Sequence, residues 1–151
     1  MEITRIEFES YSRFGMITEA YEEKLVLRPG SISFEHRPEV LKYDEVPVPD
    51  WNQPARWSYK ANSPKFEELF SSITNMVRPL LGQQTFACDA GGLTIRAAFE
   101  DKSKQEFIGF VHCSEAEPIM KALTAAIPPL EQMPQMLAAY SDEEEMQHRP
   151  G

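Results

Sequence analysis

The stretch that decides the fold is YEEKLVLRPGSISFEHR, residues 21–37. Both of its halves alternate apolar with polar side chains, and one face collects Leu25, Leu27, Ile32, Phe34 and, with them, His36. A period of two indicates a half-buried strand. Pro29-Gly30 stands between the halves and favours a tight turn, because proline presets φ and glycine tolerates a positive φ. The stretch therefore predicts two antiparallel strands joined by a hairpin.

Further segments with strand periodicity lie on both sides of this hairpin. We expect strands at Thr4–Ser10, Arg56–Ala61, Gln84–Cys88, Leu93–Phe99 and Glu106–Cys113. Most of the connections are short turns, so an antiparallel sheet is the economical arrangement.

The clearest helix signal follows the expected strand at 56–61. Ser63 supplies a capping side chain and Pro64 a proline for the first turn. Apolar residues then recur every three or four positions as far as Leu80, which predicts an amphipathic helix. We expect a second helix from about Pro118 and a short third one over Met133–Tyr140.

Both halves of the chain then run strand, strand, strand, helix, which leaves open a duplicated βββα unit. The predicted fold class is α+β: an antiparallel β-sheet of about six or seven strands, packed by two or three helices. Segment 106–113 is apolar on both sides, which indicates a central strand or a covered second sheet face. The cover would be the loop around Trp51, the Met133–Tyr140 helix or another subunit.

Composition limits the class of protein. The chain has 151 residues, with 24 acidic and 15 basic side chains and a net charge of -9. We expect a single α+β domain over residues 1–140 and an acidic, disordered tail over residues 141–151. The acidity argues against duplex nucleic acid as a partner. No apolar run is long enough to span a bilayer and residues 1–10 lack a signal-peptide core, so we expect a cytoplasmic protein without membrane contact.

Cys113 is the one candidate catalytic residue. It lies where an expected strand meets a helix, and a helix N-terminus favours the thiolate and offers N–H groups to an oxyanion. The alternative is that Cys113 is a small apolar filler of the core. A disulfide with Cys88 is not expected, because the strands that carry the two residues would flank a third.

No other motif indicates an enzyme or a bound cofactor. The three histidines do not have metal-ligand spacing, and phosphate-binding loops and hydrolase motifs are absent. We therefore expect neither a metal nor a cofactor, and we interpret His36 as a hydrogen-bonded histidine of the sheet.

Aromatic residues are the candidates for binding a ligand or a partner. Trp51 lies in the proline-rich segment 38–54, and Trp57 and Tyr59 share one face of the following strand. Basic side chains alternate with Trp57 and Tyr59. Such a pattern can stack the bases of single-stranded nucleic acid, but a core face is the simpler account.

Three functions remain open. The leading hypothesis is a non-catalytic, acidic protein-binding or regulatory module that binds either a protein partner or a second copy of itself in a homodimer. An inhibitor that covers a basic partner is a special case of it. The alternatives are a small-ligand-binding domain with Trp51, Trp57 and Tyr59 as pocket walls, and a small enzyme with Cys113 as nucleophile.

Overall fold

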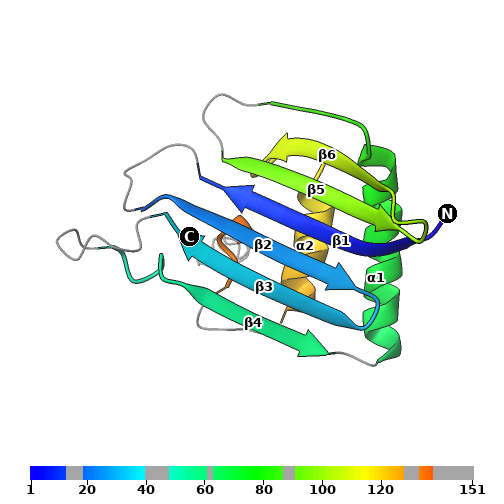
Figure 1. The fold of residues 1–151 in the computed structure, drawn as a ribbon, viewed down its shortest axis with the longest axis horizontal. Helices are drawn as coiled ribbons and strands as arrows, with labels where there is room; N and C mark the ends of the chain where they lie inside the picture. The colour runs from blue at the N-terminus through cyan, green and yellow to red at the C-terminus, as the bar shows by residue number, and fades with distance from the viewer. Residues whose placement is uncertain (13–18, 40–47, 61–62, 87–90, 128–132, 138–151) are drawn as a thin grey trace, which may run out of the picture.

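A computed structural model of the chain describes residues 1–12, 19–39, 48–60, 63–86, 91–127 and 133–137 (Figure 1). The elements follow in the order β1 (Ile3–Tyr11), β2 (Tyr21–Arg28), β3 (Ser31–Pro38), β4 (Ala55–Lys60), α1 (Pro64–Val77), the 3-10 helix η2 (Arg78–Leu80), β5 (Gly92–Phe99), β6 (Lys104–Phe110) and α2 (Glu117–Ala126). Residues 141–151 and Cys88, for which we made predictions above, lie outside the described residues.

The strands form one six-stranded sheet in the order β4-β3-β2-β1-β5-β6, and every neighbouring pair is antiparallel. Residues 21–37 form the predicted hairpin, with Leu25 opposite Phe34 and Arg28 opposite Ser31. The Pro29-Gly30 turn therefore joins the two strands directly. The predicted α+β class, an antiparallel sheet packed by helices, is confirmed.

The helices cover one face of this sheet, and the core lies between them and the strands (Figure 1). Alternate strand residues point into the core and are fully buried, among them Ile6, Phe8, Leu25, Leu27 and Ile95. Ile73 of α1 and Leu123 of α2 are fully buried as well. The opposite face of the sheet, which we call the outer face, has no helix over it in the described part of the chain.

The first helix begins where its sequence predicts. The Ser63 side chain accepts a hydrogen bond from the Phe66 amide at 3.2 Å, and Pro64 occupies the first turn. The expected helix at 133–140 is described only as far as residue 137, with residues 135–137 helical. Met136 and Leu137 are buried in the core, so this segment packs on the same face as α1 and α2 and does not cover the outer face.

The expectation of a central strand at 106–113 is wrong, because β6 is an edge strand. Its outer edge is covered by residues 82–85. The amide of Gly82 donates to the Glu106 carbonyl at 2.8 Å, the amide of Thr85 donates to the Ile108 carbonyl at 2.9 Å, and the amide of Ile108 donates to the Gln83 carbonyl at 3.2 Å. Ile108 and Phe110, the apolar residues on the outer face of β6, are half-buried. The strand also ends at Phe110 and does not reach Cys113.

The two halves of the chain do not repeat a three-strand unit. Among the described residues, four strands precede α1 and two lie between α1 and α2. Within the expected strand at 84–88, the described residues form only an isolated parallel bridge between Gln84 and Ile108. A glycine-rich, turn-like sequence follows at once, which explains why this stretch pairs over so few residues.

The turn at position 82, which places residues 82–85 beside β6, requires glycine. Gly82 has a φ of 87°, and a Cβ added there would meet no atom within 4 Å. The cost of Gly82→Ala is therefore backbone strain alone, and we expect the free energy of unfolding to fall by about 1 kcal/mol. Gly82→Asn should cost less, because asparagine tolerates a positive φ. Urea denaturation of the three proteins measures the ranking, and an alanine variant as stable as the parent would contradict it.

Candidate functional site

The helix-covered face of the sheet carries a buried polar cluster at one end. Glu23 of β2 and His36 of β3 are register partners, and each is only 3% exposed. The period of the strands places both side chains on the face of the core residues. Asn52, from the loop before β4, is fully buried beside them, and the ring of Tyr21 stacks on that of His36. We call Tyr21, Glu23, His36 and Asn52 the polar cluster.

Both ring nitrogens of His36 lie against oxygen acceptors. Nδ1 is 2.7 Å from Glu23 Oε2, and Nε2 is 2.8 Å from Asn52 Oδ1. The amide nitrogen of Asn52 donates to the Ala20 carbonyl at 3.1 Å, so the amide oxygen must face the ring. A neutral imidazole has one N–H, whereas the imidazolium has two. The arrangement therefore favours His36 as a cation paired with the Glu23 carboxylate.

The ionisation of the two rings follows from this environment. Burial alone would lower the pKa of His36, but the hydrogen bonds to Glu23 and Asn52 and the charge of Glu23 outweigh it, so this pKa lies above its ordinary value of 6.5. Burial and the nearby charge of Glu23 raise the pKa of Tyr21 to about 12. Tyr21 therefore stays a neutral phenol, with its ring centroid 5.1 Å from that of His36.

The Glu23 carboxylate also holds the segment at 133–137. Its Oε2 accepts from the Gln135 amide at 2.8 Å, and its Oε1 accepts from the Met136 amide at 2.9 Å. These amides open the helical residues 135–137, where N–H groups have no partner within the helix. A carboxylate from a strand thus caps a helical turn more than a hundred positions away in the sequence. Three donors satisfy one buried charge.

The polar cluster resembles a catalytic constellation in its residue types but not in its geometry. Ser10 of β1 pairs with Glu23 on the side opposite His36, so its hydroxyl does not contact the imidazole. A nucleophile and its base must be within hydrogen-bond reach of each other. Glu23, His36 and Asn52 are moreover shielded from solvent. The polar cluster therefore acts as a charged structural clamp, which joins two strands, a loop and the 133–137 segment.

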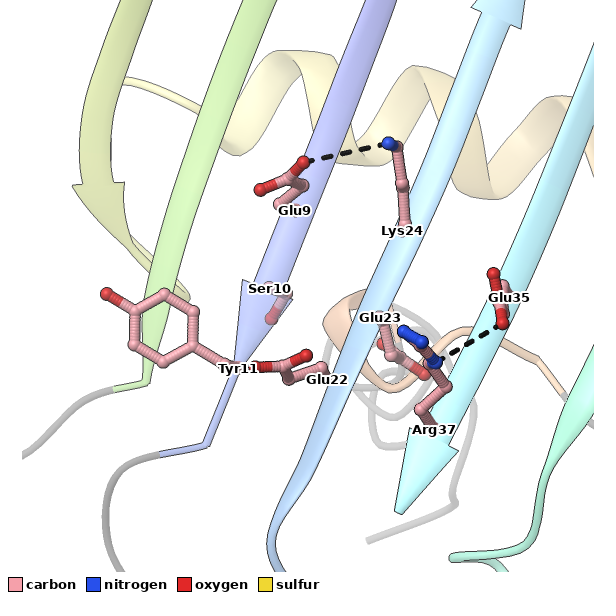
Figure 2. Close-up of a pocket in the computed structure, with 8 residues that line it drawn as sticks. All are labelled: Glu9, Ser10, Tyr11, Glu22, Glu23, Lys24, Glu35 and Arg37. Carbon is pink, nitrogen blue, oxygen red and sulfur yellow. Dashed lines mark ion pairs between the residues drawn. The ribbon is translucent and has the colours of Figure 1, made fainter. Parts of the chain in front are cut away.

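The outer face of the sheet has a shallow hollow of about 280 Å³ near the ends of β1, β2 and β3 (Figure 2). It is lined by Glu9, Ser10, Tyr11, Glu22, Glu23, Lys24, Glu35 and Arg37. Lys24 Nζ lies 3.9 Å from Glu9 Oε1, and Arg37 Nε lies 3.4 Å from Glu35 Oε1. Such ion pairs are typical of a solvated sheet face. Among the residues that line the hollow, they do not form an arrangement of a nucleophile with an activating base.

Charge is distributed unevenly over the outer face. In the half formed by β1, β5 and β6 the charges balance, as Arg5, Arg96 and Lys104 accompany Glu7, Glu9 and Glu106. Arg96 alone contacts all three of these carboxylates, at 3.3–3.4 Å. The half formed by β2, β3 and β4 instead carries Lys24, Arg28, Arg37, Arg56 and Lys60 against Glu22 and Glu35. The half beside β4 is therefore basic, on a chain whose net charge is -9.

The structure does not bring the three predicted aromatic residues into one pocket. Trp57 and Tyr59 lie on the helix side of β4 with ring centroids 5.3 Å apart, and Trp57 stacks on Phe34 at 5.2 Å. Trp51 contacts Tyr21 edge-on at 6.0 Å and is 42% exposed. A second hollow of about 190 Å³ is lined by Trp57 together with Lys24, Val26, Ser33, Phe34, Glu35, Arg56 and Ser58, so neither Trp51 nor Tyr59 contributes to it.

Cys113 is a free thiol buried in the core, with 1% of its surface exposed. Its sulfur lies 3.2 Å from the position that a Cβ on Gly109 would occupy. This placement favours the interpretation as a core filler, because a reactive cysteine is generally accessible.

Sequence reasoning missed three members of the polar cluster, Tyr21, Glu23 and Asn52. The interpretation of His36 as a hydrogen-bonded sheet histidine agrees with its two contacts. Glu23 had a signal that was overlooked, since a period of two counted back from Leu25 places it on the buried face. Asn52 had no signal, because its position depends on how a proline-rich loop folds back over the sheet.

The described residues lack two further features. They contain no group of three or more His, Cys, Asp or Glu placed to hold a metal ion. Within the same ranges, no helix is long and apolar enough to cross a membrane. Comparison of the chain with protein-family models and with curated proteins finds no match.

The first prediction for the polar cluster concerns its carboxylate. Glu23→Gln leaves a buried imidazolium without its counter-charge and weakens the cap on residues 135–136, so we expect the free energy of unfolding to fall by about 3 kcal/mol. Glu22→Gln is the matched control, since Glu22 is exposed on the opposite face of the same strand. It should change the free energy by less than about 0.5 kcal/mol. Urea denaturation followed by tryptophan fluorescence measures both, and equal effects would contradict the clamp.

The second prediction concerns pH. A pKa that is raised in the folded state adds stability at pH values below the unfolded pKa of His36, about 6.5. This stability is lost as pH rises through the folded pKa. We therefore expect the free energy of unfolding to decline above pH 6.5, and this decline to be absent in His36→Gln. His112→Asn, which alters an exposed turn residue with a φ of 73°, should keep the decline. The same decline in His36→Gln would overturn the assignment.

Proposed function

We propose that this protein is a non-catalytic binding module that accepts a segment of a partner protein along the open edge of β4. The observation that carries the proposal is the difference between the two edges of the sheet. The β6 edge is hydrogen-bonded to residues 82–85. In the described part of the chain no strand or loop pairs with the other edge of β4. An unpaired edge presents a row of N–H and C=O groups to another chain.

The side chains of β4 support the same proposal. Trp57 and Tyr59 are only half-buried on the helix side, although they pack against the core. The indole N–H of Trp57 is itself buried and has no acceptor among the described residues. A buried donor without a partner is rare in native proteins. Large aromatic residues with a polar atom are also enriched at protein interfaces.

The other two hypotheses have less support. The small-ligand hypothesis needs Trp51, Trp57 and Tyr59 to share a pocket, and the hollow that Trp57 lines includes neither of the others. The enzyme hypothesis needs an accessible Cys113, whose side chain is in the core. Both remain open to test, and neither rests on a specific contact.

Site-directed photocrosslinking tests the proposal. A benzophenone amino acid at Ser58, which is exposed in the middle of β4, should crosslink to one polypeptide when the full chain is expressed in its native cells. Ser72, exposed on α1, is the matched control and should give no such product. An excess of untagged chain should compete the product away, and mass spectrometry should place the crosslink in one segment of the partner. A product at neither position, or the same products at both, would overturn the proposal.

A further inference from the structure

The basic half of the outer face contains cations that its own carboxylates do not neutralise. Lys24 reaches across to Glu7 and Glu9 of β1, and Arg56 and Arg37 both pair with Glu35. Arg28 and Lys60 have no ion-pair partner among the described residues, and Ser31 lies between them in the register. The uncompensated positive charge therefore lies on β2, β3 and β4, the half of the sheet that is bounded by the open edge of β4.

Along β4, polar and basic side chains on the outer face alternate with aromatic side chains on the helix side. Arg56, Ser58 and Lys60 point to the outer face, and Trp57 and Tyr59 point to the helix side. A strand added to the open edge would continue this alternation, because side chains directly opposite each other share a face. Acidic side chains of that strand would meet Arg56 and Lys60, whereas apolar ones would meet the two aromatic rings.

Self-pairing of two β4 strands centred on Ser58 does not fit the pattern. Symmetric antiparallel pairing of two β4 strands about Ser58 would set Arg56 of each chain opposite Lys60 of the other. Like charges directly opposite each other destabilise a sheet. An acidic strand from a different protein relieves the charge that self-pairing would concentrate.

We infer that the partner segment is an extended strand in which acidic residues alternate with apolar ones, and that it pairs with β4 so that its carboxylates contact Arg56 and Lys60. This inference rests on the proposed function and adds the chemistry of the partner. Backbone pairing supplies the position of the segment. The charges specify its sequence and exclude basic strands.

Titration with synthetic peptides, followed by the amide signals of the full chain in NMR, tests the inference. The probe is a blocked hexapeptide that alternates glutamate with valine. We expect saturable shifts at residues 55–60 at millimolar concentration in low salt. The corresponding lysine–valine peptide should produce none. Methylation of alternate backbone nitrogens of the glutamate peptide keeps its charge but blocks strand pairing on one edge of the peptide. Two such peptides, methylated on opposite edges, are compared. At least one of them should bind at least tenfold more weakly than the unmethylated peptide.

Charge reversal provides the matched variants. Arg56→Glu with Lys60→Glu should weaken the glutamate peptide about tenfold and allow the lysine peptide to bind. Lys104→Glu with Lys121→Glu makes the same change in net charge away from β4 and should alter affinity less than twofold. Equal affinity for the glutamate and lysine peptides would overturn the inference. So would full binding of the glutamate peptide whichever alternate set of its backbone nitrogens is methylated.

Two further outcomes identify other occupants, and each would overturn the inference. One is a crosslink from Ser58 to a second copy of this chain. The other is a single-stranded oligonucleotide that shifts residues 55–60 at lower concentration than the glutamate peptide. The two proposals fail separately. No crosslink at Ser58 rejects the binding edge, whereas a crosslink to a partner segment without alternating acids rejects only the chemistry of the partner.

Discussion

The ion pair between Glu23 and His36 is the contact on which the arrangement at one end of the sheet depends. A charge in the core must be paired and hydrogen-bonded, because desolvation of an isolated ion costs several kcal/mol. The polar cluster meets this requirement with three donors to the Glu23 carboxylate, which are the His36 ring and the amides of residues 135 and 136, while Asn52 Oδ1 accepts from the other ring nitrogen of His36. If any of them moves away, the others lose a partner.

The role of this pair is to define positions more than to add stability. Apolar residues of similar volume often stabilise a core as well as a buried ion pair does. They would not, however, fix where the loop before β4 and the 133–137 segment attach, because apolar contact has no direction. The hydrogen bonds of the polar cluster have direction. The start of β4 lies three positions after Asn52, so the clamp also helps to position the edge strand that we propose as the binding site.

The parts of the fold that sequence predicted are those in which local pattern and tertiary environment agree. The β2–β3 hairpin has alternating faces and a turn that only one register satisfies, and α1 has both a cap and a continuous apolar stripe. For the strand at 106–113 the sequence left a central position or a covered second face open, because apolar residues on both sides do not distinguish a central strand from an edge protected by another segment. That distinction depends on residues 82–85, which contact β6 through backbone atoms and so leave no side-chain signature.

The candidate site was predictable only where it follows strand periodicity. Trp57 and Tyr59 share a face as expected, and Glu23 lies where a period of two places it. Asn52 and the amides at 135–136 were not predictable. Their positions follow from two distant segments folding over the same end of the sheet, and hydrogen bonds over such distances leave no pattern in one sequence.

The position of β1 in the sheet has a consequence for how the chain is made. β1 is the first strand in the sequence, yet it lies between β2 and β5, and its contact with β5 joins residues 89 positions apart, as in the pair of Glu7 and Arg96. During synthesis β1 can pair with β2 at once, but its other side has no partner until β5 has left the ribosome. Contacts of such long range slow folding and leave an edge exposed in the meantime. The charged outer-face residues of β1 keep this edge hydrated until β5 is made and disfavour premature pairing with other nascent chains.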